Sequence, residues 1–426
     1  MTRKKTKALF AVIAARVIGV SISFLMNILV TRWVNVNEAG IFFTSFSIIM
    51  LWGLIGTSGF CDAILRMRPQ LIATRNYIQA SSLALFGALI IIVISCLLSG
   101  AIYFFLTYGE SLKVYGALYI CASIPLLSMI QYTGYIFQTN GRSLLSVIII
   151  NISYPLIFSF IVLVCAVLHM EANALNLVRF LFLSIILSFI FCAVLWKKYI
   201  FTNINAVVYL KKLKYKYIIT TLLSFLLILI CNTIIQWITP IISNYYISSE
   251  DVALISVCLR IGLVISFFLI SLNVVFAPNF SKLYTEGKFD ELKLMVRSST
   301  RLVVILSLPG VAFLLLFPEF VLSIFGREYT QASIILRIVC IGQLINVLTG
   351  SVAFLLTMTG NEKIFRNIIF FNAFMMIINL NFMGGGFGIK GIACAVALSV
   401  IIQNVIAVYF VKRKLDINIL DYFYLK

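Results

Sequence analysis

Four arginines lie where the sequence is otherwise apolar, and an arginine in such surroundings can bind an anion. They are Arg16, Arg179, Arg260 and Arg337. A guanidinium at the centre of a membrane-spanning helix costs roughly 2.5–3.5 kcal/mol on insertion scales, so it is retained there for a reason. One reason is to line a water-filled cavity that attracts phosphate or carboxylate groups. The other is to satisfy backbone carbonyls between packed helices.

The depth of each arginine within its apolar run separates these two readings. Arg16 and Arg260 each follow a charged flanking residue by nine positions. At 1.5 Å per residue that distance is about 13–14 Å, near the midplane of a hydrocarbon core about 30 Å thick. Arg179 and Arg337 lie within the first two turns of their runs, where a long side chain could reach the headgroups. We predict all four as substrate-binding residues, with Arg16 and Arg260 the deepest.

Uncharged polar residues form stripes on two of the apolar runs. Arg16, Ser23 and Asn27 share one helical face of the first run, and Asn232 and Gln236 share a face of a later one. Such stripes either line a polar cavity or hold neighbouring helices together, and the sequence leaves both readings open. We predict the four uncharged residues as further substrate-binding positions.

The residue types needed for catalysis or metal binding are scarce. The sequence has one histidine, His169, and nine cysteines without a CxxC pair. The cysteines lie in or at the edge of apolar runs, as packing residues do. No nucleotide-binding motif is present. We therefore predict no catalytic residues, no metal site and no cofactor.

The composition places the chain in a membrane. The sequence is 62% hydrophobic and 11% charged, whereas soluble domains have about 45–50% apolar and about 25% charged residues. Twelve apolar runs are long enough to cross a bilayer as helices. They cover approximately residues 8–30, 40–62, 78–106, 114–137, 144–168, 175–196, 217–239, 251–276, 302–318, 332–357, 364–382 and 389–411.

A basic segment, residues 196–217, divides the twelve runs into six and six, and it contains six lysines and no acidic residue. The polar turns at Gly141 and Gly360 are alike and lie about half a chain apart, as in an internal repeat. We predict an all-α integral membrane protein with twelve transmembrane helices in two pseudo-symmetric six-helix bundles around a central cavity. The bundles would be residues 1–205 and 206–426, joined by this basic cytoplasmic connector.

Lysine and arginine are distributed unevenly between the two sides of the membrane. With the amino terminus inside, 25 of the 33 lie on the cytoplasmic side and four on the opposite side. Positive charge concentrates in cytoplasmic loops, so we expect both termini in the cytoplasm. This bias accounts for the net charge of +19 without a nucleic-acid partner.

Five short motifs are spread over nearly the whole chain. They are RWVNVNEAG at 32–40, QTNGR at 138–142, PNFSKLYTEGKFDELKLMVR at 278–297, FGREYTQA at 325–332 and GFGIKGIACA at 386–395. In this order they resemble the polysaccharide flippases of the multidrug/oligosaccharidyl-lipid/polysaccharide exporter superfamily. Arg260 stands where related lipid flippases often carry an arginine.

The resemblance implies a transporter of the cell inner membrane, not an enzyme. Its substrate would be an undecaprenyl-pyrophosphate-linked oligosaccharide repeat unit, flipped from the cytoplasmic to the outer leaflet for O-antigen, lipopolysaccharide or capsule biosynthesis. The implied partners are this lipid-linked oligosaccharide, membrane lipid, and the polysaccharide polymerase and chain-length machinery.

Two other functions stay open, a drug/cation antiporter of the same fold and a membrane oligosaccharide polymerase. A cation site within the membrane needs deep carboxylates. The acid nearest an apolar run is Asp62, which we expect to pair with Arg66 one helical turn later. A polymerase usually carries a large loop on the outer side, and the predicted outer loops are short. Both considerations favour the flippase.

Overall fold

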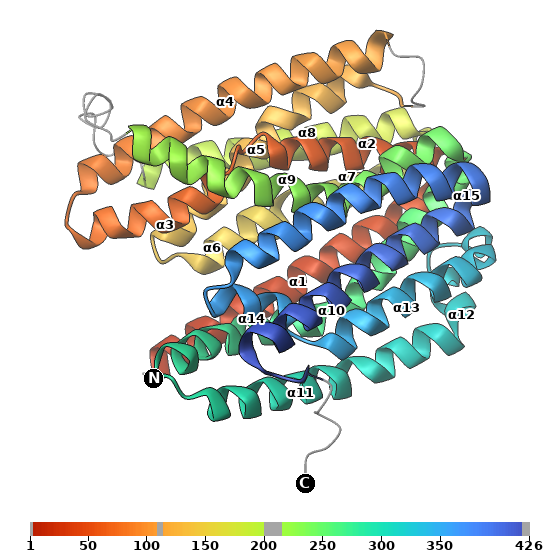
Figure 1. Ribbon diagram of the computed structural model, residues 1–426. Helices are drawn as coiled ribbons and strands as arrows, with labels where there is room; N and C mark the ends of the chain where they lie inside the picture. Colours follow the sequence, from red (N-terminus) through yellow and green to blue (C-terminus); the bar gives the residue numbers. More distant parts are fainter. Residues whose placement is uncertain (1–2, 109–113, 200–214, 420–426) are drawn as a thin grey trace. The chain divides into compact units, whose positions relative to one another are not determined.

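The computed structural model describes residues 3–108, 114–199 and 215–419, and these ranges are built of helices (Figure 1). No strand occurs in them. The predicted all-α fold class is confirmed. Most of the basic connector predicted at 196–217 lies outside the described residues, as does the predicted boundary after residue 205.

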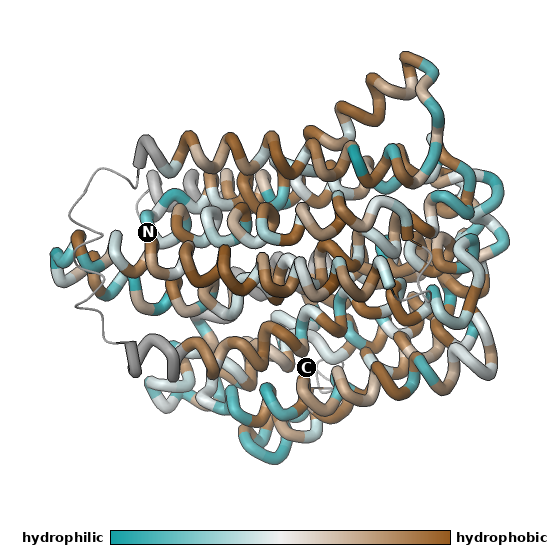
Figure 2. Tube along the Cα trace, turned by 90° about the horizontal axis from the view of Figure 1, so that it is seen from above, coloured by the Kyte–Doolittle hydropathy of each residue, from teal (hydrophilic) through white to brown (hydrophobic). Residues whose placement is uncertain are grey.

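In the described ranges ten helices are long and apolar enough to cross a membrane. One of them, α15 (Glu362–Leu415), is broken at Gly388, where φ is 57° and ψ is −141°. Its 54 residues would extend about 81 Å as one helix, so the two arms are separate crossings. Figure 2 shows apolar residues along the helices and hydrophilic residues gathered at their ends. The chain is a multi-pass membrane protein.

Contacts divide the chain into two compact units, Met1–Ile241 and Ile242–Lys426. The first unit comprises α1 (Arg3–Trp33), α2 (Val36–Ile55), α3 (Phe60–Ala73), α4 (Tyr77–Tyr108), α5 (Ala117–Thr139), α6 (Ser143–Val147), the π-helical turn η1 (Ile148–Ile152), α7 (Ser153–Val167), α8 (Ala174–Tyr199) and most of α9 (Tyr215–Tyr246). Within it α5 is central and packs against α2, α3, α4, α6 and α8.

Hydrogen bonds from α5 join it to its neighbours. The Ser128 hydroxyl donates to the Gly53 carbonyl of α2 at 2.7 Å, and the Tyr132 hydroxyl donates to the Ala84 carbonyl of α4 at 3.0 Å. Lipid offers a polar side chain no alternative partner, so hydroxyls of this kind bond across helix contacts and help to hold them.

Gly87 of α4 lies against Tyr132 and leaves no room for a side chain. A Cβ at position 87 would overlap the Tyr132 hydroxyl oxygen and lie 2.7 Å from the ring carbon Cζ. We expect Gly87→Ala to destabilise the protein by about 1–3 kcal/mol, the usual range for overpacking. The measurement is the thermal unfolding midpoint of the purified protein in detergent.

Two further variants control this prediction. Gly100 lies in the same helix, and a Cβ there would have no atom within 4 Å, so Gly100→Ala should not lower the midpoint. Tyr132→Phe removes the obstructing oxygen together with its hydrogen bond to Ala84. Adding Gly87→Ala to the Tyr132→Phe protein should therefore lower the midpoint less than adding it to the wild type. Equal losses from Gly87→Ala and Gly100→Ala would contradict the steric explanation.

The second unit is built around α13. It comprises the end of α9, α10 (Ser249–Thr285), α11 (Phe289–Leu316), α12 (Pro318–Ser323), the 3-10 helix η4 (Arg327–Ala332), α13 (Ser333–Thr349), α14 (Val352–Met358) and α15. Helix α13 packs against α10, α11 and α15. The span predicted at 332–357 is instead two helices, because Gly350 has a φ of 64° and ends α13.

Candidate functional site

Arg16 lies near the middle of α1 with an exposed side chain. A polar side chain of α5, Tyr135, lies near it. Tyr135 of α5 is close enough to interact electrostatically with both Arg16 and Asp62, which belongs to α3. We call Arg16, Asp62 and Tyr135 the polar cluster of the first unit. It combines a fixed positive charge, a carboxylate and a phenol within the bundle.

A tight turn between α2 and α3 positions the carboxylate of this cluster. Gly59 has a φ of 77°, and a Cβ there would lie 3.2 Å from the Leu222 carbonyl oxygen of α9. The turn therefore needs glycine for its backbone conformation and for the approach of α9. Asp62 follows in the first turn of α3, where the helix dipole stabilises a negative charge.

The expected pairing of Asp62 with Arg66 does not occur. None of the ion pairs in the described part of the chain joins these two residues. Asp62 is half-buried, Arg66 is exposed, and Asp62 interacts electrostatically with Cys61 and Tyr135. The apolar run predicted at 40–62 would end at Asp62, whereas in the structure the apolar segment continues through α3.

The predicted polar stripe of α1 is partly a packing face. Asn27 is 5% exposed, and its Nδ2 donates to the Ser23 carbonyl at 2.6 Å. A Cβ on Gly19, between Arg16 and Ser23, would lie 3.1 Å from Asn151 Cβ in η1. Ser23 is half-buried, which leaves Arg16 as the exposed member of the stripe.

No sequence pattern indicated the π-helical turn η1. The Ser153 amide donates to the Ile148 carbonyl five residues earlier, which widens the helix by one residue. Such turns are frequent at functional sites. Here the turn exposes the Asn151 side chain beside α1.

Arg179 and Arg337 have local partners. The Arg179 guanidinium lies over the Tyr119 ring at 5.6 Å and donates to Asn176 Oδ1 at 3.4 Å. Arg337 Nε donates to the Leu315 carbonyl at 3.2 Å, in the last turn of α11. The last carbonyls of a helix lack intrahelical donors, so this arginine acts as a cap. Both side chains are exposed, and these contacts fit the structural reading of the two arginines.

Asn232 and Gln236 are exposed and lie one turn apart on α9. The next residue, Trp237, packs edge-on against Phe46 of α2 at 5.5 Å, which fixes this part of α9 on the first unit. No hydrogen bond in the described part of the chain joins either amide to Arg16.

In the second unit Arg260 is half-buried on α10, the helix that also contributes to one of two branches of hydrogen-bonded polar side chains. We call the two branches together the amide network, although no hydrogen bond of the described residues joins one branch to the other. Its members are Ser266, Gln343, Asn346, Thr349 and Asn404 in the first branch, and Asn372, Ser399 and Gln403 in the second.

One branch of the amide network links α10, α13 and α15. The Ser266 hydroxyl donates to Gln343 Oε1 at 2.6 Å, and Asn346 Nδ2 donates to the Ser266 oxygen at 3.1 Å. Asn404 Nδ2 donates to Asn346 Oδ1 at 3.3 Å, while its Oδ1 accepts from Thr349 at 3.1 Å. Asn404 is 7% exposed, so the branch runs into the interior of the unit.

A second branch joins the two arms of α15. Asn372 Nδ2 donates to Gln403 Oε1 at 2.7 Å, and the Ser399 hydroxyl donates to Asn372 Oδ1 at 2.9 Å. Every member of the network is uncharged, and each amide offers both donors and acceptors. These are the groups that pair with hydroxyl-rich ligands. The network was not predicted from the sequence, although Gln343 and Asn346 lie at i and i+3 within an apolar run.

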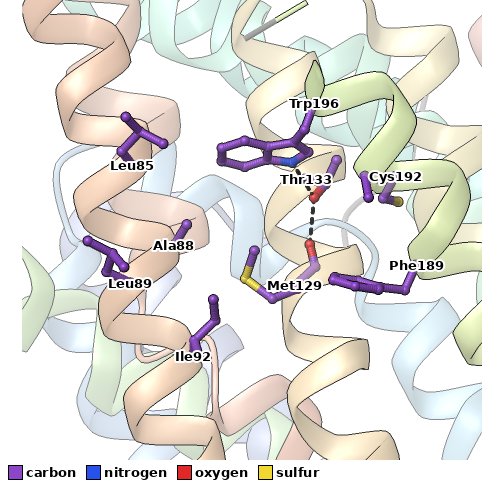
Figure 3. A pocket seen from close by; sticks show the side chains of 10 residues that line it. Leu85, Ala88, Leu89, Ile92, Met129, Thr133, Phe189, Cys192 and Trp196 are labelled. Atoms are coloured by element: carbon purple, nitrogen blue, oxygen red, sulfur yellow. Dashed lines mark hydrogen bonds between the residues drawn. The ribbon is translucent and has the colours of Figure 1, made fainter. Parts of the chain in front are cut away.

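A pocket of about 410 Å³ lies between α4, α5 and α8 (Figure 3). Trp196 Nε1 donates to Thr133 Oγ1 at 2.8 Å, and Thr133 in turn donates to the Met129 carbonyl at 2.7 Å. Its polar groups are thus already paired, and the rest of its lining is apolar. The pocket suits a hydrocarbon chain and contains none of the predicted site residues. Among the described residues no cluster of His, Cys, Asp and Glu could hold a metal ion.

A family model described as MatE matches residues 225–383, less than half of the chain. No curated protein sequence matches significantly. Several solved structures match nearly the whole chain, among them three at 14% identity each. The first is an inward-facing multidrug resistance MATE family transporter of the MOP superfamily, with a TM-score of 0.75 over 95% of this chain and 98% of that one.

The second similar structure is the lipid II flippase MurJ in an inward closed conformation, with a TM-score of 0.71 over 94% of this chain and 87% of that one. The third is a MOP superfamily transporter from Pyrococcus furiosus, for which the reverse polarity of its binding pocket suggests a different function. Its TM-score is 0.66 over 96% of both chains. These likenesses show that the chain has the fold of these MOP superfamily transporters.

Proposed function

We propose that this chain, a membrane protein with the fold of MOP superfamily transporters, flips undecaprenyl-pyrophosphate-linked oligosaccharide repeat units across the cell inner membrane. The product would be surface polysaccharide such as O-antigen or capsule. One observation carries the proposal: Arg16 is exposed near the middle of a membrane-spanning helix and belongs to none of the ion pairs of the described residues. Charges within a membrane lie at water-filled cavities or beside a polar partner, and a pyrophosphate is a partner of opposite charge.

Uncharged polar groups near the arginines give the proposal further support. Arg16 shares α1 with Ser23 and Asn27, and Arg260 shares α10 with Ser266 of the amide network. Sugar hydroxyls both donate and accept hydrogen bonds, as amide side chains do. The fold likeness to a lipid II flippase is consistent with a lipid-linked sugar as cargo.

In the proposed cycle the two bundles, residues 1–205 and 206–426, enclose a central cavity with both chain termini in the cytoplasm. The headgroup enters from the cytoplasmic side with its phosphates near Arg16 and Arg260. The polyprenyl chain stays in lipid. The bundles then rock against each other to open outward, and the polymerase and chain-length machinery use the delivered unit.

The proposal is tested with purified protein in liposomes that contain a fluorescent undecaprenyl-pyrophosphate-linked oligosaccharide. A glycosidase added outside removes the label only from the outer leaflet, so transport appears as a growing accessible fraction. We expect transport with the protein and none in protein-free liposomes. Equal rates in both preparations would contradict the proposal. In cells, depletion of the protein should remove surface polymer and leave the lipid-linked unit on the cytoplasmic side.

A drug/cation antiporter of the same fold is the second candidate, and Asp62 is the observation that favours it. This carboxylate is half-buried within an apolar helical segment and interacts electrostatically with Tyr135. A carboxylate in such a place can bind a proton or an organic cation. Liposomes of the same kind loaded with a cationic dye distinguish the two functions. Proton-driven dye transport without oligosaccharide transport would favour the antiporter and contradict the flippase.

A further inference from the structure

A groove of about 350 Å³ lies between the two arms of α15 in the second unit. Its lining consists of Ile364, Asn367, Ile368, Phe371, Ile406 and Phe410, five of which are apolar. The inner side rests on a buried hydrophobic cluster that includes Ile368. The outer side is open, since Phe371 is 44% exposed. The groove therefore has a well-packed apolar floor and an open side through which a hydrocarbon chain can enter.

The two arms run antiparallel and side by side, as Figure 1 shows. The hydrogen bond between Asn372 and Gln403 fixes their register. Nine residues before Asn372 is Lys363, and nine residues after Gln403 is Lys412. Each lies about 13–14 Å along its arm from that hydrogen bond, at 1.5 Å per residue. The register thus brings two cations of distant sequence to the same end of the groove.

Three more basic residues, Arg366, Arg413 and Lys414, lie at this end. Together with Lys363 and Lys412 they form what we call the basic end. All but Arg366, which is half-buried, are exposed. None of them takes part in an ion pair of the described residues. Two acids lie at this end. Asp416 is paired with Lys293 of α11 at 3.2 Å, and Glu362, next to Lys363, offsets one of the five positive charges.

Polarity along the groove changes in the order found along a phospholipid molecule. The cations lie at the end, where a phosphate would be. The amide of Asn367 lies one helical turn deeper, about 6 Å from the level of Lys363, at a depth suited to an ester carbonyl. Ile368, Phe371 and Ile406 lie deeper still and offer only hydrocarbon surface.

We propose that this groove binds one anionic phospholipid, with an acyl chain between the arms of α15 and the phosphate on the basic end. A soluble anion would leave the apolar groove unused, and a zwitterionic lipid would leave most of the positive charge uncompensated. Basic pockets between transmembrane helices are known to hold anionic headgroups. The proposal does not depend on which substrate the protein transports.

The test uses the purified full-length protein in nanodiscs of phosphatidylcholine with a minor share of phosphatidylglycerol that carries a photoactivatable acyl chain. Mass spectrometry of the cross-linked peptides locates the lipid. We expect cross-links at residues 364–371 and 406–410. A basic residue near an anionic headgroup contributes a factor of about five, so Lys363→Gln/Lys412→Gln/Arg413→Gln should reduce them roughly tenfold or more.

Two variants make the result specific. Lys390→Gln removes one positive charge from the opposite end of the same hairpin and should leave the cross-linking unchanged. Lys412→Gln alone is its matched counterpart at the basic end and should reduce cross-linking about fivefold. Ile406→Trp fills the groove but keeps every charge, so it should reduce acyl-chain cross-links even if the triple variant were to fold poorly. Equal labelling of wild type and Ile406→Trp would overturn the proposal. So would equal labelling by a phosphatidylcholine probe, or displacement of the probe by undecaprenyl phosphate but not by phosphatidylglycerol.

Discussion

Arg16→Ala is expected to lower the transport rate of lipid-linked oligosaccharide by roughly 10- to 100-fold while the protein remains abundant in the membrane. A hydrogen bond to a charged group contributes about 1.5–3 kcal/mol, which corresponds to that factor. The side chain is exposed and joins no ion pair of the described residues, so its loss costs little packing. Liposome transport and surface polymer, both scaled to the amount of protein, measure the effect.

Three further variants define what the guanidinium does. Arg16→Lys keeps the charge but loses the planar fork that matches phosphate oxygens, so it should retain part of the activity. Arg260→Ala should resemble Arg16→Ala. Arg327→Ala removes an exposed arginine of η4 outside the proposed site and should transport normally. Normal transport by abundant Arg16→Ala and Arg260→Ala proteins would exclude the anion site.

Arg68→Ala is expected to cause the largest loss of stability, about 3 kcal/mol or more. Arg68 is 6% exposed, and its Nε donates to the Ala80 carbonyl at 3.3 Å. One terminal nitrogen donates to the Ile136 carbonyl at 3.4 Å, to Thr139 Oγ1 at 2.6 Å and to Asn140 Oδ1. A single guanidinium thus ties α3 to the start of α4 and the end of α5. The substitution removes four hydrogen bonds from a charged donor in a buried position, and a hydrogen bond to a charged group contributes about 1.5–3 kcal/mol.

Membrane abundance and the thermal midpoint of the purified protein measure this loss. Arg68→Lys should rescue little of it, because an ammonium cannot reach partners on two sides as the planar fork does. Arg66→Ala is the matched control, since Arg66 is exposed on the same helix two residues earlier. A midpoint for Arg68→Ala equal to that of Arg66→Ala would show that the buried contacts contribute nothing.

Arg68 also shows where sequence reasoning fails. From the sequence it counts among the loop charges that orient the chain, because the residues after Asp62 form no long apolar run. In the structure they form α3, whose buried face includes Arg68 and Met67. The tight turn at Gly59 starts this helix, and the partners of Arg68 lie up to 72 residues away. Contacts at such separations leave no local pattern in one sequence.

The helical spans themselves were predictable, because a run of about twenty apolar residues has the length and composition of a membrane-spanning helix. The predicted eleventh and twelfth spans, 364–382 and 389–411, correspond to the two arms of α15 around Gly388. The predicted stripe on α1 was visible from spacing, but its partial burial against η1 was not. Which polar residues meet across helices depends on register and rotation, as the hydrogen bond of Ser266 to Gln343 illustrates.

The amide network has a consequence for how the protein responds to protons. Asparagine, glutamine, serine and threonine do not ionise in the physiological range, so acidification leaves the internal bonds of this network unchanged. The polar cluster of the first unit contains a carboxylate, Asp62, and therefore has two protonation states. The two units therefore differ in their response to pH. The amide network of the second unit keeps its protonation state, whereas Asp62 gives the first unit a group that can take up or release a proton.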